Sequence, residues 1–392
     1  MTDYARRLAC LRPSTIRELL KVTLQPEIIS FAGGLPAPEL FPVAEISEAC
    51  RRVLAEEGPQ ALQYGPSEGY PPLREYLAGE MRRRGIDCPF EQILITSGSQ
   101  QAIDLCAKIL LDPGDVVLTE SPTYLAAIQV FQSYEARFVQ VPTDDDGLLP
   151  EALPPLIERY RPKLLYTIPN FQNPTGRTLS AARRAELVRI AAETGLTIVE
   201  DDPYGRLRYA GEELAPLKSL DRTGQVIYLS TFSKTIAPGL RVGWAVARPE
   251  ILQKMLIAKQ AADLHTSSLD QRVIHRYLRD GDPEKHLAAI RRVYGERYRV
   301  MDRALRAGMP SGFGWTHPEG GMFLWVTCPP EVDTGELLQA AIEHKVMFVP
   351  GRDFFPDGSG RNFMRLNFSN AAPAKIEEGI ARLAALCRQA VS

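Results

Sequence analysis

Between about residues 90 and 248, short runs rich in β-branched residues alternate with amphipathic helical segments, and this alternation constrains the fold more than any other feature. QILITSG is followed by the helical SQQAIDLCAKILL, and DVVLTE is followed by TYLAAIQVFQSY. KLLYTIP, LTIVEDD, QVIYLST and RVGWAVA are further predicted strands, and SAARRAELVRIAAETG is a predicted helix that ends at a glycine. This order predicts an α/β layer with a mostly parallel sheet and helices on both faces.

The remainder of the chain predicts a second, smaller domain. One long helix is expected over about 283–307, followed by the strands GMFLWVT, KVMFVPG and NFMRLNFS and a terminal helix. The first 45 residues are too few for a domain and are expected to pack against the C-terminal one. We therefore predict an N-terminal arm and helix over 1–45, a large domain over 46–290 and a small α+β domain over 291–392.

Composition and charge narrow the class of protein. The 392 residues are 45% hydrophobic and 24% charged, with a formal net charge of -2, which is typical of a soluble globular protein and argues against nucleic-acid binding. The six cysteines are widely spaced, and no apolar run approaches the length of a membrane span. These features predict a cytoplasmic protein without disulfides.

The segment TSGSQQA places Gly98 and Ser99 between a predicted strand and a predicted helix. Free backbone N–H groups and the positive end of the helix dipole favour a phosphate at such a point. A serine N-cap after a tight turn is the alternative. The segment is neither a Walker loop nor GxGxxG, which disfavours ATP or NAD.

Polar residues also follow two other predicted strands. Asn173, in NFQNPTG, precedes a proline that holds it extended, so that its amide can point into a cleft or simply form a turn. Asp201, in VEDDPYG, ends a strand three residues before Tyr204, and could bind a metal, act as a base, pair with a cationic ring or lie in a solvated turn. The five histidines show no metal-binding spacing, so no metal is expected.

The segment STFSKTIAPGLRVGW gathers Thr231, Ser233, Lys234 and Arg241 between two predicted strands. Hydroxyls with a guanidinium suit a phosphate, and a lysine beside them suits a Schiff base with an aldehyde. A solvated basic turn is the alternative. Together with a carboxylate for a pyridinium nitrogen and donors for a ring hydroxyl, these groups suit one cofactor, pyridoxal 5'-phosphate.

With these motifs in order, the chain resembles a fold-type-I pyridoxal-phosphate enzyme of the class I/II aminotransferases. It is most similar to the 2-aminoadipate and multi-substrate aminotransferases within that group. The resemblance covers essentially the whole chain, from STIRELL and SFAGGLPAPELFP through QYGPSEGYPPLRE to FMRLNFS. It implies a large domain that binds the cofactor on a mostly parallel sheet, and a smaller α+β domain.

The resemblance also implies roles for individual residues. Lys234 would bind the cofactor aldehyde, Asp201 the pyridine nitrogen, and Arg365 the substrate α-carboxylate. The remaining implied cofactor contacts are Asn173 and Tyr204 to the ring oxygen, Tyr124 to the ring face, and Ser99, the Gln100 backbone, Thr231, Ser233 and Arg241 to the phosphate. Thr231 stands where a serine is often found, but its hydroxyl can make the same bond.

Three further residues carry implications for substrate and assembly. Tyr64 matches a tyrosine that reaches the phosphate of the partner subunit, which implies a homodimer with shared sites. Gly34 and Asn173 are expected beside the substrate. Arg17 matches a helix arginine that can meet a distal acidic side chain, although it could equally be an exposed helix residue.

The activity implied is ping-pong transamination from an L-amino acid to 2-oxoglutarate, with a 2-aminoadipate, aromatic or branched/aliphatic donor. A β-lyase or synthase of the same fold is an alternative. The effector domain of a transcription regulator is a second one, disfavoured because only about 45 residues precede the large domain. The bonds before Pro122 and Pro174 are predicted candidates for cis geometry.

Overall fold

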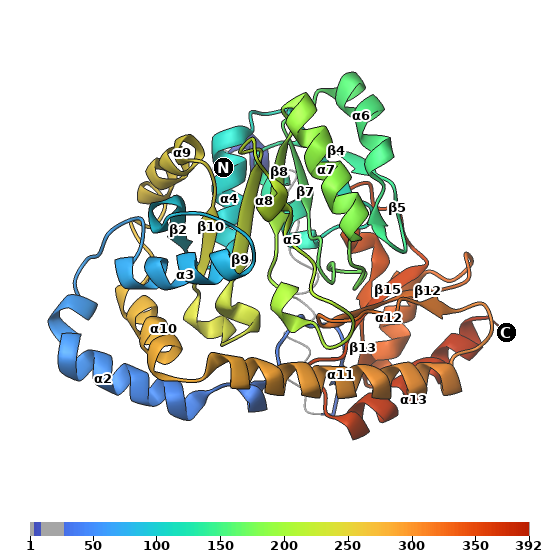
Figure 1. Cartoon of the computed structure of the whole chain (residues 1–392). Coiled ribbons are helices and arrows are strands. Elements are labelled where there is room, and N and C mark those ends of the chain that lie inside the picture. The colour runs from blue at the N-terminus through green and yellow to red at the C-terminus, as the bar shows by residue number, and fades with distance from the viewer. Residues whose placement is uncertain (1–3, 9–26, 392) are drawn as a thin grey trace.

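A seven-stranded sheet forms the centre of the computed structural model, which describes residues 4–8 and 27–391 (Figure 1). Its strand order is β2-β10-β9-β8-β7-β3-β4. The strands are β2 (Ile93–Thr96), β3 (Val116–Glu120), β4 (Arg137–Val141), β7 (Leu164–Thr167), β8 (Thr197–Asp201), β9 (Val226–Thr231) and β10 (Gly243–Val246). Only β10 runs antiparallel to its neighbours in this sheet, so the prediction of a mostly parallel sheet is confirmed.

Alternate residues of these strands pack into separate hydrophobic cores on the two faces of the sheet. Val199 of β8 and Tyr166 of β7 pack on the face covered by α4 (Ser99–Leu110) and α5 (Leu125–Ser133). Ile198 and Leu165, one residue earlier in each strand, pack on the opposite face with α7 (Ala181–Thr194) and α8 (Leu217–Leu220). Both faces are buried, which explains why the strands read as continuous apolar runs.

Near the outer β2 edge, three other helices build a separate core. These are α2 (Val43–Ala61), α3 (Pro71–Arg83) and α10 (Ser268–Asp280). Helix α9 (Pro249–Gln260) packs beside α4, and α6 (Leu153–Tyr160) beside α7. The sequence analysis assigned none of these five helices.

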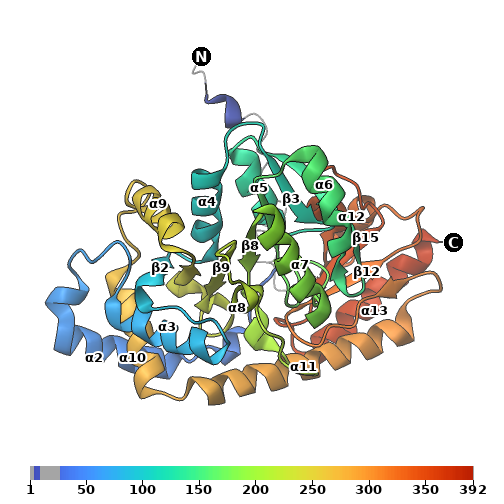
Figure 2. The same ribbon diagram turned by 45° about the horizontal axis from the view of Figure 1, so that its top comes forward.

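The C-terminal part forms a four-stranded sheet in the order β11-β12-β15-β14. Its strands are β11 (Gly314–Trp315), β12 (Phe323–Thr327), β14 (Val349–Pro350) and β15 (Phe363–Asn367), with helices α12 (Thr334–Glu343) and α13 (Pro373–Ala390). Helix α11 (Pro283–Gly308) matches the predicted long helix. It runs along the lower side of the molecule toward this part and packs against α13 (Figures 1 and 2).

Of the described N-terminal residues, the 3₁₀ helix Arg6–Leu8 lies against α5 of the large sheet, whereas the chain from residue 27 joins the C-terminal part. Strand β1 (Ile29–Ser30) pairs in parallel with β13 (Val346–Met347), and Phe31 packs into the same core as the C-terminal helix. The boundaries at residues 45 and 290 stay predictions.

Two local features complete the comparison with the sequence analysis. The peptide bonds before Pro122 and Pro174 are both cis, as predicted. Strand β4 and the short hairpin of β5 (Thr143–Asp144) and β6 (Gly147–Leu148) were missed. Strand β4 lies at the edge of the sheet and is only partly buried, so it lacks the continuous apolar signal of the central strands.

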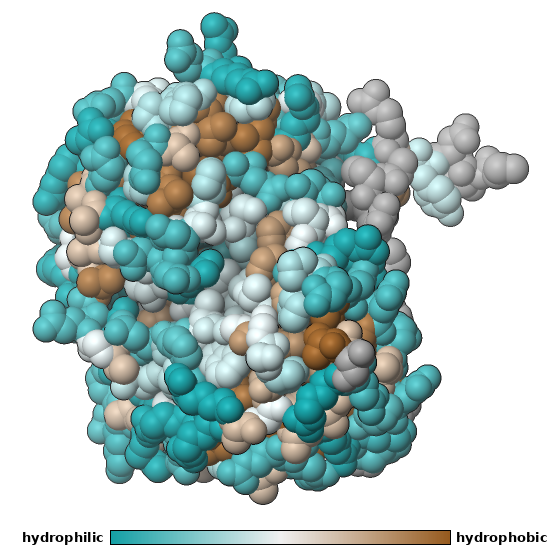
Figure 3. Space-filling model, turned by 90° about the vertical axis from the view of Figure 1, so that its right-hand side faces the viewer, coloured by the Kyte–Doolittle hydropathy of each residue, from teal (hydrophilic) through white to brown (hydrophobic). Residues whose placement is uncertain are grey.

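The surface on the C-terminal side is mixed in character. Figure 3 shows hydrophilic residues around the outline of this face and hydrophobic residues in separate patches. Within the described residues, no helix is long and apolar enough to cross a membrane.

Candidate functional site

A cavity of about 380 Å³ lies where the carboxyl ends of β8 and β9 meet the N-terminus of α4 and the small sheet. In a parallel sheet this edge is the usual place for a ligand. Twelve of the residues singled out from the sequence line it: Gly34, Ser99, Gln100, Tyr124, Asn173, Asp201, Tyr204, Thr231, Ser233, Lys234, Arg241 and Arg365. The fold therefore gathers into one cavity residues that are far apart in the chain.

Lys234 ends a short 3₁₀ helix (Phe232–Lys234) that follows β9 directly. Its Nζ donates a hydrogen bond to the backbone oxygen of Gly34 over 2.9 Å. Burial, followed by the positive charges of Arg365 and Arg241, lowers the pKa of Lys234 to about 8. The amine is thus neutral far more often near pH 8 than an exposed lysine, and a neutral amine is the nucleophile that an aldehyde requires.

Asp201 is the last residue of β8, and its side chain is buried beneath the cavity. The hydroxyl of Tyr166 donates to Oδ2 of Asp201 over 2.7 Å, whereas Oδ1 has no hydrogen-bond partner among the described residues. Burial, opposed by the bond from Tyr166 and assisted by the charge of Asp202, raises the pKa of Asp201 to about 7. A buried, unsatisfied carboxylate oxygen fits a cationic ring N–H.

Strand alternation decides which of three consecutive acids faces the cavity. Glu200 and Asp202 point to the other side of β8 from Asp201. Glu200 accepts the backbone N–H groups of Leu217 and Lys218, each over 2.8 Å. Asp202 is bound by Arg84 over 2.7 Å and by the Tyr228 hydroxyl over 3.0 Å. Only Asp201 is therefore available to a ligand.

At the other end of the cavity, hydroxyl and guanidinium groups surround the N-terminus of α4. Gly98, before that helix, has a φ of 79°, and a Cβ there would lie 2.5 Å from Nη2 of Arg241. Arg241 Nη1 donates to Ser233 Oγ over 3.3 Å, and Thr231 Oγ1 lies 2.9 Å from the same Oγ. A helix N-terminus with a guanidinium and two hydroxyls fits a phosphate group.

Arg365, on β15, forms the cavity wall contributed by the small sheet, and only 1% of the residue is exposed. Its Nη1 donates to Asn173 Oδ1 over 2.8 Å and its Nη2 to the oxygen of Ala32 over 2.6 Å. The guanidinium lies over the ring of Phe323, 4.3 Å from the centroid, and its Nε has no partner among the described residues. Such a group can bind a carboxylate that enters the cavity.

Asn173 connects this arginine to the ring-binding side. Its Nδ2 donates to the hydroxyl of Tyr204 over 3.4 Å. Both side chains are buried and line the cavity together with Asp201 and Arg365. Asn173 and Tyr204 can therefore donate to an oxygen of a ligand ring.

Of the described sequence-predicted residues, Tyr64 does not line the cavity. Tyr64 is 78% exposed, and its ring contacts His265 edge-on, with 5.7 Å between centroids. Arg17 lies outside the described residues.

Three residues at the site carry no signal in the sequence: Phe323 and Gln129 line the cavity, and Tyr166 binds Asp201. Tyr166 and Phe323 lie within apolar strands, where an aromatic residue is expected for packing alone. No local motif marks any of the three, and only the strand order brings Tyr166 beside Asp201.

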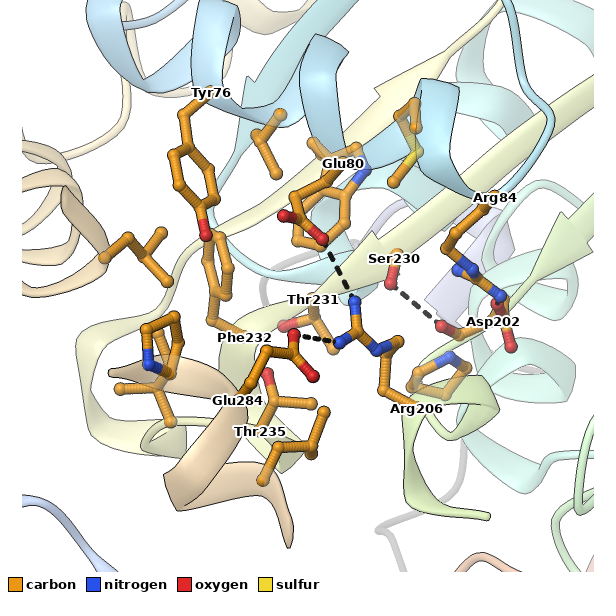
Figure 4. Close-up of a pocket in the computed structure, with 18 residues that line it drawn as sticks. Tyr76, Glu80, Arg84, Asp202, Arg206, Ser230, Thr231, Phe232, Thr235 and Glu284 are labelled. Carbon is orange, nitrogen blue, oxygen red and sulfur yellow. Dashed lines mark hydrogen bonds and ion pairs between the residues drawn. The ribbon is translucent and has the colours of Figure 1, made fainter. Parts of the chain in front are cut away.

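A second, smaller pocket of about 70 Å³ lies on the Asp202 side of the sheet (Figure 4). Arg206 lies between Glu80 and Glu284 and is paired with both, with Glu80 over 3.0 Å, and Arg84 is paired with Asp202. Its charged groups thus already satisfy one another, and we assign it no ligand. The described residues contain no group of three or more His, Cys, Asp or Glu arranged to hold a metal ion.

The side chains that line the large cavity fit pyridoxal phosphate. The orphaned Oδ1 of Asp201 suits the ring nitrogen, the low-pKa amine of Lys234 suits the aldehyde, and the glycine turn under Arg241 suits the phosphate. Asp201, Lys234 and Arg241 form no ion pair with another described residue, so a ligand can bind them without breaking one.

Comparison with known proteins gives a family match. A family model for aminotransferases of class I and II matches residues 27–383. The chain is 47% identical to the aromatic-amino-acid aminotransferase 1 of Thermococcus litoralis, covering 97% of this chain and 93% of that protein. It is 46% identical to the 2-aminoadipate transaminase of Thermus thermophilus, covering 95% and 93%.

Comparison with solved structures supports the same family. The crystal structure of the α-aminoadipate aminotransferase LysN from Thermus thermophilus, complexed with N-(5'-phosphopyridoxyl)-L-leucine, superimposes with a TM-score of 0.93. The two chains are 44% identical, with 99% of this chain and 98% of that chain covered.

Proposed function

Because the chain belongs to the aminotransferases of class I and II and is a fold-type-I, pyridoxal-phosphate-dependent enzyme, we propose that it transfers the amino group of an L-amino acid to 2-oxoglutarate. The reaction has two half-reactions, in which the donor leaves as its 2-oxo acid before the acceptor binds. The proposed donors are 2-aminoadipate, aromatic and branched or aliphatic amino acids. The names of the two relatives and the leucine adduct in the LysN structure support this range.

One observation carries the proposal: Lys234, Asp201 and Arg365 line the same cavity although they come from three separate elements. A reactive amine, a buried acid for a ring nitrogen and an arginine for a carboxylate are the three groups that this chemistry requires. Pyridoxal phosphate, when bound, supplies the electron-accepting ring and the aldehyde.

The chain's own residues supply orientation and proton transfer. Arg365 binds the α-carboxylate of the donor and so fixes the direction in which the Cα–H bond points. The pKa of Lys234 is lowered to about 8, so a larger fraction of its amine is neutral than in an exposed lysine. The neutral amine can remove the proton from Cα and return it. Asp201 would hold a positive charge at the ring nitrogen, which would stabilise negative charge that develops during the reaction.

Ring and phosphate contacts keep the reacting atoms in place. Asn173 and Tyr204 would donate to the ring oxygen, and Tyr124 would cover the ring face. The phosphate end would be held by Ser99, the Gln100 backbone, Thr231, Ser233 and Arg241. The hydrogen bond of Arg365 to Asn173 Oδ1 supports the proposed link between substrate and ring positions.

The choice of donor depends on residues at the outer part of the cavity. Gly34, Leu35 and Phe323 offer apolar contacts to a donor side chain. Arg17 is proposed to bind a distal carboxylate, as in 2-aminoadipate. Comparing Arg17→Ala on 2-aminoadipate and on leucine checks this role, since only the acidic donor should lose activity; an equal effect on both contradicts it.

We further propose that the enzyme is a cytoplasmic homodimer with shared sites. The high exposure of Tyr64 supports its reach toward a partner's phosphate site. The described cysteines are free, and four of them are buried, which suits a reducing compartment.

The experiment that tests the function is an amino-donor panel with 2-oxoglutarate, measuring glutamate and the donor's oxo acid. Equal amounts of both products are expected, with activity lost in Asp201→Ala. Release of pyruvate and ammonia without an acceptor would instead indicate a lyase. Absence of any turnover together with DNA binding would indicate a regulator's effector domain, and near-normal activity of Asp201→Ala would refute the assigned site.

A further inference from the structure

Tyr166 lies beneath the cavity and contacts its buried acid directly. It is on β7, which pairs in parallel with β8 so that Tyr166 is opposite Val199, two residues before Asp201. Tyr166 and Asp201 therefore point to the same face of the sheet, where the tyrosine hydroxyl donates to Oδ2 over 2.7 Å. Tyr166 is fully buried and does not line the cavity itself.

We propose that Tyr166 is a positioning residue that holds Asp201 ionised and oriented, with Oδ1 directed toward the cofactor ring nitrogen. This inference rests on the proposed function. A carboxylate has two oxygens, and in this structure one is occupied by Tyr166 while the other has no partner among the described residues. The tyrosine thereby determines which oxygen is left for the ring.

The surroundings of Asp201 make this bond necessary. The ionisable groups that shift the pKa of Asp201 are Tyr166 on β7 and Asp202 next to it. Asp201 in turn helps to raise the pKa of Tyr204, beyond the strand, and of Cys106 on α4. Burial and Asp202 both favour the neutral acid and raise its pKa, whereas the hydrogen bond from Tyr166 favours the ionised form. Without that bond, the acid would more readily be neutral and could no longer pair with a cationic ring.

Tyr166 is well suited to act as a fixed donor. Burial and the neighbouring carboxylate raise the pKa of its phenol well above the ordinary value, so the hydroxyl keeps its proton. Its ring is packed edge-on against Phe131, with 5.7 Å between centroids and 70° between planes. A ring held by packing places its hydroxyl without a further loss of side-chain freedom on ligand binding.

The decisive variant is Tyr166→Phe, which removes the hydroxyl and keeps the ring. We expect kcat to fall about 10- to 100-fold, which corresponds to the loss of a hydrogen bond to a charged group. The KM for the donor should change by less than about threefold, because Arg365 is untouched. The readout beyond activity is ¹⁵N NMR of bound pyridoxal phosphate labelled at the ring nitrogen, which should shift toward the unprotonated form.

Tyr228→Phe is a matched control. Tyr228 is also a fully buried strand tyrosine, but its hydroxyl donates to Asp202, on the opposite face of β8, over 3.0 Å. Loss of this hydroxyl should lower stability and leave the ring nitrogen protonated. If Tyr228→Phe shifts the ¹⁵N signal as much as Tyr166→Phe does, the specific role of Tyr166 is overturned.

A double variant separates positioning from simple packing. In an Asp201→Asn background, Tyr166→Phe should leave the ¹⁵N signal of the ring nitrogen almost unchanged, because the tyrosine acts through the acid. A shift equal to that in the wild type would refute the inference. If Asp201→Asn is inactive but Tyr166→Phe keeps the wild-type ¹⁵N signal and the wild-type kcat, the role of Tyr166 is refuted and the proposed function stands. If the wild-type enzyme does not catalyse transamination, the proposed function itself is refuted.

Discussion

Arg365 and Asn173 are joined by a 2.8 Å hydrogen bond between Nη1 and Oδ1, although they lie in different parts of the molecule. Arg365 belongs to β15 of the small sheet, whereas Asn173 follows β7 of the large sheet. The bond brings the residue assigned to the substrate carboxylate against a residue assigned to the cofactor ring. A change at this arginine should therefore affect donor binding first.

Arg365→Lys tests this relationship. Lysine keeps the charge but cannot bind a carboxylate through two parallel N–H groups or keep both present bonds. We expect kcat/KM for the donor to fall about 100-fold, mostly through a higher KM. Steady-state kinetics checks this, with the exposed Arg361→Lys as a control that should behave as the wild type. A changed kcat with an unchanged KM would contradict the assignment.

Covalent attachment should occur at Lys234. Reduction of the enzyme with borohydride in the presence of pyridoxal phosphate is expected to fix the cofactor on the peptide that contains Lys234, because its buried amine lines the cavity. Peptide mass spectrometry measures this. Lys259→Met is the control, since Lys259 is also buried but is paired with Asp263 outside the cavity. Labelling of the Lys234→Ala variant by pyridoxal phosphate and borohydride would contradict the assignment of Lys234.

The pH dependence of cofactor uptake follows from the lowered pKa of Lys234. The pKa is about 8 in the folded chain, so the fraction of reactive neutral amine rises as the pH approaches 8 and levels off above it. The rate at which the cofactor-free enzyme binds pyridoxal phosphate should follow the same curve. In Arg365→Met, loss of a nearby positive charge should raise the pKa of Lys234 and move the curve to higher pH. A displacement of the curve to lower pH in Arg365→Met would contradict the prediction.

Arg84 should be important for stability. Its guanidinium is the ion-pair partner of Asp202, whose side chain is fully buried on the second face of β8. Arg84→Met leaves that charge unpaired and should lower the free energy of unfolding by about 3–5 kcal/mol. Arg206→Met, which removes more exposed ion pairs beside the same pocket, should cost less than about 1 kcal/mol. Urea unfolding compares the two, and equal losses would contradict the prediction.

Shared sites in a homodimer can be tested by complementation. Lys234→Ala should be inactive, and Tyr64→Ala should bind the cofactor weakly. If Tyr64 serves the partner's site, a mixed dimer of the two variants contains one site with both residues intact. Activity should therefore return when the variants are unfolded together and refolded as a mixture. No recovery, with mixed dimers present by mass spectrometry, would refute sharing.

Much of the site was predictable because its chemistry lies at the ends of strands. The runs KLLYTIP, LTIVEDD and QVIYLST each contain a central apolar stretch, and polar residues lie at the end of each run or soon after it. Parallel strands bring their carboxyl ends to one edge, so Asn173, Asp201 and Lys234 could be expected together before any coordinates were known. Their clustering around one cavity agrees with that expectation.

Other features depended on pairing between distant segments. The sequence VEDDPYG offers three adjacent acids, and the face that each one occupies depends on the register of β8 within the sheet. Tyr166 is one aromatic residue among many in apolar strands, and it becomes important only because β7 lies beside β8. Arg84, 118 positions from Asp202, has no local signal at all.

The amino-acid sequence alone thus determined the α/β class, the positions of the central strands and the kinds of chemical group at their ends, because short apolar runs and helical periodicity are local properties of the chain. The tertiary structure decided which oxygen of Asp201 is free, which acid is neutralised by Arg84, and that Arg365 closes the cavity from the small sheet. Those relationships depend on strand order and on packing between parts far apart in the chain, which no local pattern encodes.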